Sequence, residues 1–98
     1  MDITASELKS RMNSDNKPVI VDVRDEWEYE EENIGGISIP LGSLSDHVDE
    51  LEEYKDQELI VHCRSGNRSR AAQQYLQQQG FTNVRNLQGG IIAYLIEK

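Results

Sequence analysis

The chain has 98 residues, of which 37% are hydrophobic and 29% are charged, and its formal net charge is −8. This composition is typical of a folded domain rather than a disordered chain, and the length predicts one domain over residues 1–98. The acidic balance argues against nucleic acid and against an anionic membrane surface as partners, because both attract lysine and arginine.

The cysteine count and the apolar runs place further limits on the chain. A single cysteine, Cys63, cannot form an internal disulfide. No apolar run approaches the roughly 20 residues needed to span a bilayer, and no charged and apolar leader is visible. The simplest interpretation is a location in the cytoplasm. We also expect a monomer.

The first third of the chain carries signals for a helix, a strand and a second helix. Thr4 and Glu7 predict a capping box at the start of a helix. The stretch VIVDV, residues 19–23, is short and almost entirely apolar, which is typical of a strand buried on both faces of a parallel sheet. Asp25 then predicts the N-cap of a short acidic helix in DEWEYEEEN.

Strands and helices continue to alternate through the rest of the chain. GGISIP predicts a turn and a short strand, and SLSDHVDELEEY places Leu44, Val48 and Leu51 on one helical face. ELIVH, residues 58–62, and TNVRNL predict two more strands. SRAAQQYLQQQG predicts a helix that stops at Gly80, and a last helix follows the double glycine of GGIIAYLIEK. This alternation predicts an α/β fold with a mainly parallel sheet.

The loop after the second buried strand is the candidate site. Ligands of parallel sheets bind beyond the carboxyl ends of the strands, where Cys63 and Arg24 are both expected. Gly66 gives the loop conformational freedom, so its N–H groups and the following helix N-terminus can converge on one point. A thiol at this point should lose its proton more easily, and the thiolate is the reactive nucleophile. Arg64 and Arg68 can then hold an anionic substrate by bidentate hydrogen bonds.

These features predict a site where a small anion meets a sulfur nucleophile. Cys63 is the predicted catalytic residue, and the predicted substrate-binding residues are Arg64, Ser65, Gly66, Asn67, Arg68 and Ser69. The alternative is that a lone cysteine at a strand end is a small buried hydrophobe. However, cations at a helix N-terminus oppose the helix dipole, so stability alone does not favour the arginines there.

Two residues near the loop are predicted to support it. Asp22 can brace the loop arginines, and Arg24 can line the mouth of the pocket, although a structural ion pair explains each residue equally well. His62 precedes Cys63 on a strand and therefore points to the opposite face, which argues against a cysteine–histidine dyad. The spacing of the cysteine and the two histidines does not fit a zinc site, so we expect neither a metal nor a cofactor.

The run DEWEYEEE, residues 25–32, is the most acidic stretch of the chain. Its simplest interpretation is a solvated helix face that also supplies charge partners. The alternative is a surface that docks a basic partner. Trp27 and Tyr29 within it are expected to pack in the core or at its rim.

The chain resembles the rhodanese family of sulfurtransferases over nearly its full length, and three stretches carry the resemblance. VIVDVRDEWEYE is similar to the family's strand, Asp-Val-Arg and acidic helix, and HCRSGNRS resembles its active-site loop. GFTNVRNLQGGIIAY resembles its closing strand and Gly-Gly turn, with Tyr94 where a tryptophan is common. The cysteine loop is the specific part of the match. The resemblance implies a rhodanese-like domain over 1–98, with a central, mainly parallel five-stranded sheet and helices on both faces.

One stretch departs from the family pattern. Many members carry Gly-His-Ile-x-Gly-Ala before the short third strand, whereas this chain has ENIGGISIP. Asn33 stands at the usual histidine, Ile37 follows the glycine, and the connection is one residue shorter. We expect the departure to affect the path of this loop and the choice of partner rather than the thiol chemistry.

Loop length separates two chemistries. Related phosphatases use Cys-x5-Arg, whose wider cradle holds a phosphate, whereas Cys63 to Arg68 is Cys-x4-Arg. The resemblance therefore implies transfer of a sulfane sulfur from thiosulfate or a protein persulfide to cyanide, a thiol or a sulfur-carrier protein, through a persulfide on Cys63. The alternatives are a phosphatase-like enzyme acting on phosphate or arsenate, and a non-catalytic sulfur-carrier or regulatory module.

The two loop arginines have different expected roles. Arg64 is the better candidate for contact with the substrate. Arg68 either contacts the substrate or turns inward to pair with an acid such as Glu28, Glu30 or Glu31.

Overall fold

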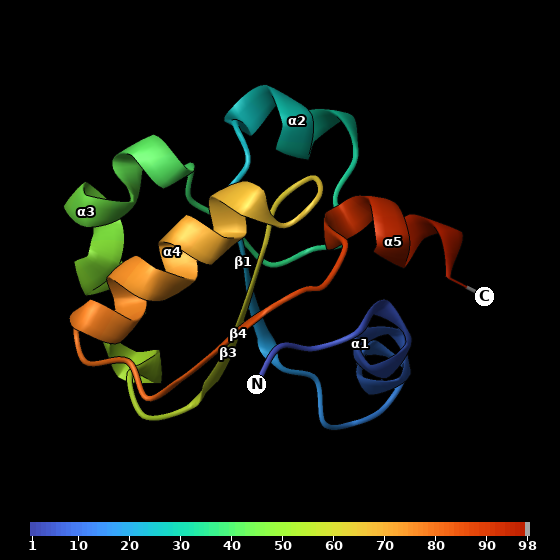
Figure 1. The fold of residues 1–98 in the computed structure, drawn as a ribbon, viewed down its shortest axis with the longest axis horizontal. Coiled ribbons are helices and arrows are strands. Elements are labelled where there is room, and N and C mark those ends of the chain that lie inside the picture. The colour runs from blue at the N-terminus through green and yellow to red at the C-terminus, as the bar shows by residue number, and fades with distance from the viewer. Residues whose placement is uncertain (98) are drawn as a thin grey trace.

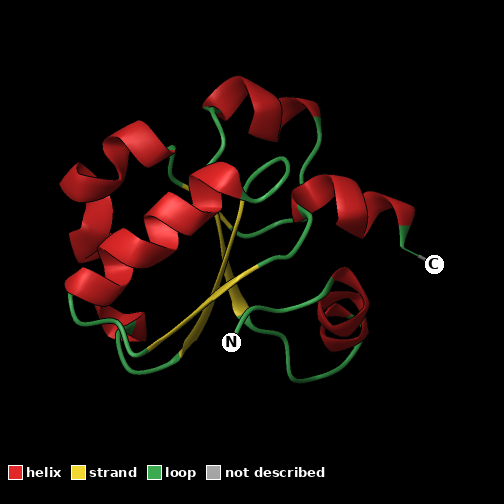
Figure 2. Ribbon diagram, in the orientation of Figure 1, coloured by secondary structure: helices red, strands yellow, loops and turns green. Residues whose placement is uncertain are grey.

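The computed structural model describes residues 1–97, which form a parallel sheet between two groups of helices (Figure 1, Figure 2). The strands are β1 (Val19–Asp22), β2 (Ile37–Ser38), β3 (Glu58–His62) and β4 (Asn83–Asn86). The helices are α1 (Ala5–Met12), α2 (Glu26–Glu31), α3 (Leu44–His47), α4 (Asn67–Gln78) and α5 (Gly90–Ile96), and 3-10 segments cover Leu41–Ser43 and Val48–Tyr54. The strand order is β2-β1-β3-β4 and every pair is parallel. The predicted α/β fold class is confirmed.

Apolar side chains cover both faces of the sheet, which explains why the central strands are almost entirely apolar. Val21 and Val61 pack with Leu76 of α4 on the face that α3 and α4 cover. Ile20 and Ile60, one position earlier in each strand, pack on the opposite face with α1. Figure 1 shows α3 and α4 on one side of the strands and α1 and α5 on the other.

The described chain contains four strands, so the expectation of five is wrong. The place beside the end of β4 is taken by Ile3, which forms one isolated parallel bridge to Leu87. Its N–H donates to the carbonyl oxygen of Asn86 at 3.0 Å. The bridge cannot extend into a strand because the next residue, Thr4, is already the N-cap of α1.

The segment after Pro40 forms two short helical types rather than one continuous helix. Leu44 and Val48 are four positions apart, which suits the α-helical turn of α3. Val48, Leu51 and Tyr54 follow at intervals of three, which suits the 3-10 segment that contains them. Leu44 and Leu51 are buried, so the apolar positions face the core as predicted.

The stretch that departs from the family pattern forms a closed turn into β2. Asn33 Nδ2 donates to the carbonyl oxygen of Tyr29 at 2.9 Å, and so caps the end of α2. Gly36 adopts φ +93°, and a Cβ there would lie 2.6 Å from the carbonyl oxygen of Ile20, so only glycine fits. Ile37 then pairs with β1. Asn33 therefore has a local structural role in this chain.

The longest helix, α4, has 12 residues and ends as predicted. Gln79 is its C-cap, and Gly80 adopts φ +95° directly after it.

Within residues 1–97, no helix has the length and apolar character needed to cross a membrane.

Candidate active site

The loop from Cys63 to Gly66 joins the carboxyl end of β3 to the N-terminus of α4 (Figure 1). Cys63 lies at its floor and is 1% exposed, whereas Arg64 and Ser65 are exposed. Gly66 adopts φ +115°, a conformation that favours glycine. The turn at Gly66 brings the first turn of α4 back toward Cys63.

Three hydrogen-bond donors converge on the Cys63 sulfur. The N–H of Gly66 lies 3.2 Å from Sγ, and the N–H and Oγ of Ser69 lie 3.3 and 3.4 Å from it. Burial raises the pKa of the Cys63 thiol, but hydrogen bonds from Ser69 and from the N–H groups of Gly66 and Ser65 outweigh it, so the pKa lies below its ordinary value. The cradle therefore favours a negative charge on sulfur.

Asn86, at the end of β4, holds this cradle and was not predicted from the sequence. Its Nδ2 donates to the carbonyl oxygen of Gly66 at 3.2 Å, which fixes the orientation of the amide. Its Oδ1 lies 2.5 Å from Ser69 Oγ. A hydroxyl has one proton, so Ser69 donates either to Asn86 Oδ1, which is the nearer acceptor, or to the Cys63 sulfur, which as a thiolate is the stronger one. The sequence signal that could have identified Asn86 is a polar residue at the end of a buried strand.

Arg68 turns toward α2 rather than toward the sulfur. Its Nη1 and Nη2 lie 2.7 and 3.1 Å from the two carboxylate oxygens of Glu28. The hydrogen bond from Arg68 lowers the pKa of Glu28 from 4.5 to about 2, although burial opposes this change. Of the three acids considered from the sequence, Glu28 is the partner, and both terminal nitrogens of Arg68 are engaged with it.

A groove of about 450 Å³ opens beside the loop. It is lined by residues of α2 and its C-cap, of the loop, and of α5, together with Arg24: Arg24, Trp27, Glu28, Glu31, Glu32, Arg64, Ile91, Ile92 and Leu95. Trp27 is 62% exposed and lines the groove, so of the two expected positions, in the core or at its rim, the core is excluded. Among the described residues, the side chain of Arg64 forms no hydrogen bond or ion pair, which leaves its guanidinium available to an anion.

The Gly-Gly turn holds α5 against the loop. The N–H of Ile91 donates to the carbonyl oxygen of Cys63 at 2.9 Å, and the N–H of Ile92 donates to that of Arg64 at 3.3 Å. Gly90 adopts φ +63°, and a Cβ there would lie 2.2 Å from the Arg64 carbonyl oxygen. The second glycine is therefore required for this close approach.

A protein-family model described as Rhodanese-like domain matches residues 4–97. This match covers almost the entire chain. The chain belongs to the rhodanese-like family.

Named relatives of this rhodanese-like chain differ in length. A sulfurtransferase of Allochromatium vinosum is 34% identical over 94 residues, which cover 95% of this chain and 86% of that protein. A tRNA uridine(34) hydroxylase of Erwinia tasmaniensis is 32% identical over 97 residues, but the match covers 94% of this chain and only 27% of the hydroxylase. The chain therefore spans about a quarter of that relative and most of the sulfurtransferase.

A solved structure shares the fold closely. The crystal structure of SSP1007 from Staphylococcus saprophyticus has a TM-score of 0.84 and 33% identity, over 95% of this chain and 91% of that one. The arrangement of sheet and helices in this rhodanese-like chain is therefore that of its structural neighbours.

Asp22 and Arg24 form a buried pair beneath the rhodanese-like loop. Arg24 Nε and Nη2 lie 3.0 and 2.7 Å from Asp22 Oδ1 and Oδ2, and Nη2 also donates to the carbonyl oxygen of Glu32 at 2.7 Å. Asp22 therefore binds Arg24 rather than a loop arginine. His62 Nε2 lies 3.6 Å from Asp22 Oδ2. Burial lowers the pKa of His62 and the charge of Asp22 opposes this only in part, which favours a neutral ring that makes no hydrogen bond to the Cys63 sulfur.

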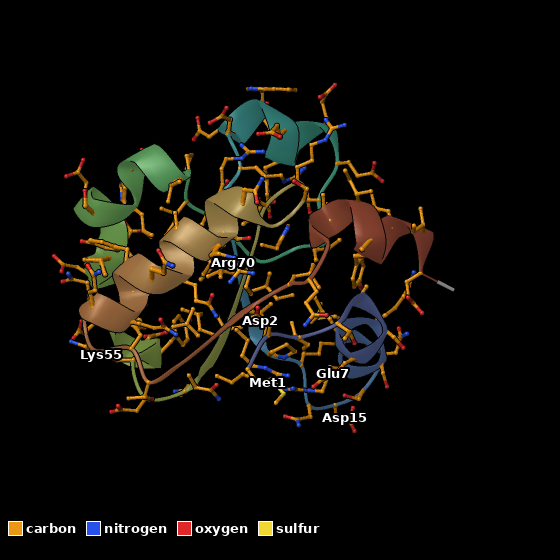
Figure 3. All side chains as sticks on the ribbon, viewed as in Figure 1. Met1, Asp2, Glu7, Asp15, Lys55 and Arg70 are labelled. Atoms are coloured by element: carbon orange, nitrogen blue, oxygen red, sulfur yellow. The ribbon has the colours of Figure 1, made fainter. Side chains whose placement is uncertain are left out.

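The third arginine of the motif, Arg70, lies on the surface. Figure 3 shows it near Asp2, and its Nη2 is 3.8 Å from Asp2 Oδ2. Asp2 Oδ1 in turn accepts hydrogen bonds from Gln73 Nε2 and the N–H of Asn86, at 3.0 and 3.2 Å. Arg70 thus belongs to the contacts that hold Asn86, and not to the groove.

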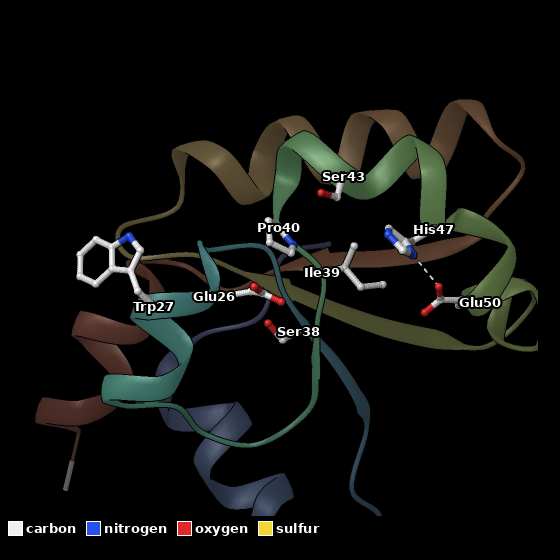
Figure 4. Close-up of a pocket in the computed structure, with 8 residues that line it drawn as sticks. All are labelled: Glu26, Trp27, Ser38, Ile39, Pro40, Ser43, His47 and Glu50. Atoms are coloured by element: carbon white, nitrogen blue, oxygen red, sulfur yellow. Dashed lines mark hydrogen bonds and ion pairs between the residues drawn. The ribbon is translucent and has the colours of Figure 1, made fainter.

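A larger hollow of about 580 Å³ lies between α2, β2 and α3 (Figure 4). It is lined by Glu26, Trp27, Ser38, Ile39, Pro40, Ser43, His47 and Glu50. No residue of the cysteine loop lines it. His47 is exposed and pairs with Glu50 at the edge of this hollow. Because this hollow lies away from the cysteine loop, the smaller groove, which Arg64 lines, is the better candidate for the approach to Cys63.

Proposed function

We propose that residues 1–98 act as one rhodanese-like domain that transfers a sulfane sulfur through a persulfide on Cys63. One observation carries the proposal. Two backbone N–H groups and the Ser69 hydroxyl converge on the Cys63 sulfur at the floor of the family's loop. The same donors suit the negative terminal sulfur of a persulfide. Membership of a sulfurtransferase family supports this assignment.

The first half-reaction loads the sulfur. The Cys63 thiolate attacks the outer sulfur of thiosulfate, the bond between the two thiosulfate sulfurs breaks, and its electron pair leaves with sulfite. The product is a Cys63 persulfide anion, so charge and atoms balance without an oxidant. Arg64 holds the sulfonate oxygens, because its side chain is exposed, lines the groove and belongs to the residue that follows the nucleophile.

The second half-reaction removes the sulfur. An acceptor attacks the terminal sulfur, and the electron pair of the sulfur–sulfur bond returns to Cys63. Cyanide gives thiocyanate, and a thiol or a sulfur-carrier protein gives a new persulfide. Because Cys63 is the only cysteine, no second thiol of the chain can take the sulfur. Donor and acceptor then alternate on one residue, which predicts ping-pong kinetics.

The phosphatase alternative finds less support in the geometry. Arg68 corresponds to the arginine that ends the phosphatase Cys-x5-Arg loop, and both of its terminal nitrogens are bound by Glu28 rather than free for a phosphate. The sulfur-carrier alternative shares the Cys63 persulfide and differs only in lacking turnover with small molecules. These alternatives give different results in one set of measurements.

The test is intact-mass spectrometry before and after thiosulfate. We expect a gain of about 32 Da, one sulfur atom, that cyanide reverses with release of thiocyanate. Cys63→Ser, a variant of matched size, should show neither, and a thermal melt checks that it is folded. A persulfide that cyanide cannot remove would favour the carrier role. No adduct, together with hydrolysis of an aryl phosphate, would support the phosphatase instead.

A further inference from the structure

The large exposed apolar side chains gather on the groove side of the molecule. Apart from Met1, the large apolar side chains exposed on the described residues are Trp27 of α2 and Ile92, Leu95 and Ile96 of α5. Ile92 and Leu95 are each 44% exposed and line the groove together with Trp27. Helices α2 and α5 lie next to each other in Figure 1, on either side of the cysteine loop. Contiguous exposed apolar side chains are typical of interaction sites.

The side of the groove formed by α2 and its C-cap also carries acids. Glu31 and Glu32 line it, and neither carboxylate forms a hydrogen bond or ion pair with any residue of the described chain. Glu26 and Glu30 are exposed on the same short helix. By contrast, the half-buried acids Glu28 and Glu58 are both bound by arginines. Among the described residues, the groove therefore presents two unpaired carboxylates on α2 and its C-cap, against one unpaired cation, Arg64, at the cysteine loop.

The groove also lies beside the loop that carries the nucleophile, since Arg64 lines it. The first residues of α5 donate their N–H groups to the carbonyl oxygens of Cys63 and Arg64. Cys63 is 1% exposed, so a flat protein surface cannot reach its sulfur. An extended segment with a protruding thiol can, if its flanking side chains fit the groove.

We propose that this groove docks a basic, apolar segment of an acceptor protein that carries a thiol. The proposal rests on the function proposed above and specifies its acceptor. Apolar side chains of the segment lie against Trp27, Ile92 and Leu95, and its lysines or arginines face Glu31 and Glu32. A second copy of this chain, with net charge −8, would bring like charges together, and nucleic acid would meet the same repulsion.

After docking, the terminal sulfur of the Cys63 persulfide is transferred to the thiol of the segment. The thiolate of the segment attacks the terminal sulfur of the Cys63 persulfide. The bond between that sulfur and Cys63 Sγ breaks, its electron pair stays on Cys63 as the thiolate, and the sulfur leaves bonded to the segment. No oxidant or reductant is needed.

Two synthetic peptides test the proposal: acetyl-Lys-Leu-Cys-Leu-Lys-amide and its counterpart with glutamate in place of lysine. Protein loaded with thiosulfate is mixed with each peptide, and loss of the protein's added sulfur is followed by mass spectrometry. We expect the basic peptide to react about tenfold faster, as is typical of complementary charge at an interface. Intrinsic thiol reactivity differs between the peptides, so the decisive quantity is how protein variants change their ratio.

The variants separate local from overall charge. Glu31→Lys with Glu32→Lys should lower the ratio of basic to acidic peptide rates at least about fivefold. The bond from Arg24 to residue 32 uses the backbone carbonyl and is retained. Asp49→Lys with Asp56→Lys is the matched control, since both acids are exposed and lie outside the groove. It should keep the ratio within about twofold, because screening weakens distant charges.

A third variant tests the apolar wall. Leu95→Ser should slow both peptides about threefold through lost apolar contact. In Leu95→Ser, which changes no charge, the reaction with cyanide should match wild type. In the lysine variants, cyanide turnover serves only to show that the Cys63 persulfide still forms and reacts, because added positive charge attracts the cyanide anion.

The outcomes separate this proposal from the proposed function. Retained cyanide turnover with an unchanged peptide ratio in the Glu31/Glu32 variant, or an equal drop in the control, would overturn the docking site alone. Failure of wild type to form a persulfide would overturn the function itself. If wild type sediments as a dimer that Leu95→Ser dissociates, the groove binds a second copy, and the proposal is wrong.

Discussion

Arg64 and Arg68 belong to the same loop and first helical turn, but only Arg68 has a partner. Its two nitrogens fit the carboxylate of Glu28, a planar pairing that fixes the side chain and ties α4 to α2. The Arg64 side chain is exposed and makes no polar contact with residues 1–97. The same residue type thus braces the loop at one position and is free to bind an anion at the other.

This difference predicts opposite effects of two alanine substitutions. Arg68→Ala should lower the thermal midpoint by about 4–8 °C, because a pair of this kind contributes about 1 kcal/mol. Its KM for thiosulfate should stay within about twofold of wild type. Arg64→Ala should leave the midpoint unchanged and raise KM about tenfold through the lost charge-assisted bonds. Melting curves and steady-state kinetics measure both quantities.

Arg70→Ala is the control for these substitutions. Arg70 is exposed, and its distance of 3.8 Å to Asp2 indicates a weak surface pair. Neither the midpoint nor KM should change. A larger rise in KM for Arg68→Ala than for Arg64→Ala would reverse the two roles.

At the scale of elements, local signals explain what the sequence predicted well. The apolar runs of β1 and β3, the N-cap at Asp25 and the stop at Gly80 each act within a few neighbouring residues, and each element forms where it was expected. They also place Cys63 at the end of a strand and before a helix. The thiol and its loop could therefore be predicted from the sequence alone.

The features that were missed depend on contacts between distant segments. Asn86 holds Gly66 and Ser69 from 20 and 17 positions away in the chain. The partner of Arg68 could only be narrowed to three acids, because it lies 40 positions away. The fifth strand fails to form because Ile3 has room for a single bridge.

The contact between α5 and the loop gives a prediction at this scale. Gly90→Ala should destabilise the fold by at least about 2 kcal/mol, since a positive φ and a direct clash with the Arg64 carbonyl combine. Displacement of the loop should also slow persulfide formation. Gly42→Ala is the matched control, because no atom lies within 4 Å of the added carbon there. Unfolding by urea and the rate of loading by thiosulfate measure the two effects, and wild-type values for Gly90→Ala would refute the contact's role.

Across the whole molecule, acids and arginines join segments that are distant in the chain. Glu58 of β3 binds Arg11 of α1 at 2.6 Å and Arg85 of β4 at 2.7 Å. Glu28 of α2 binds Arg68 of α4 at 2.7 Å. These pairs hold the layers around the sheet, while the unpaired acids of α2 remain at the groove. The carboxylates thus fall into two groups: some pair with arginines and support the fold, and others face solvent. The second group accounts for the net charge of −8.

The Glu28 pair should be visible in the pH dependence of unfolding. Its pKa is lowered from 4.5 to about 2 in the folded chain, so between these values the unfolded chain binds more protons. The stabilisation is therefore fully present above pH 4.5 and is lost as the pH falls toward 2. Glu28→Gln removes it, and should lower the free energy of unfolding at neutral pH by about 1 kcal/mol.

Urea unfolding followed by circular dichroism between pH 2 and 7 provides the measurement. The curve of Glu28→Gln should be flatter than that of wild type below the ordinary carboxyl pKa of 4.5, and the two should converge near pH 2. Glu30→Gln is the matched control, since this exposed glutamate is on the same helix and forms no ion pair within residues 1–97. Its curve should follow wild type throughout. If the free energy of unfolding of Glu28→Gln falls with pH as steeply as that of wild type, the loss of stability in acid arises from another group. Glu58, which binds two arginines, is then the next carboxylate to substitute.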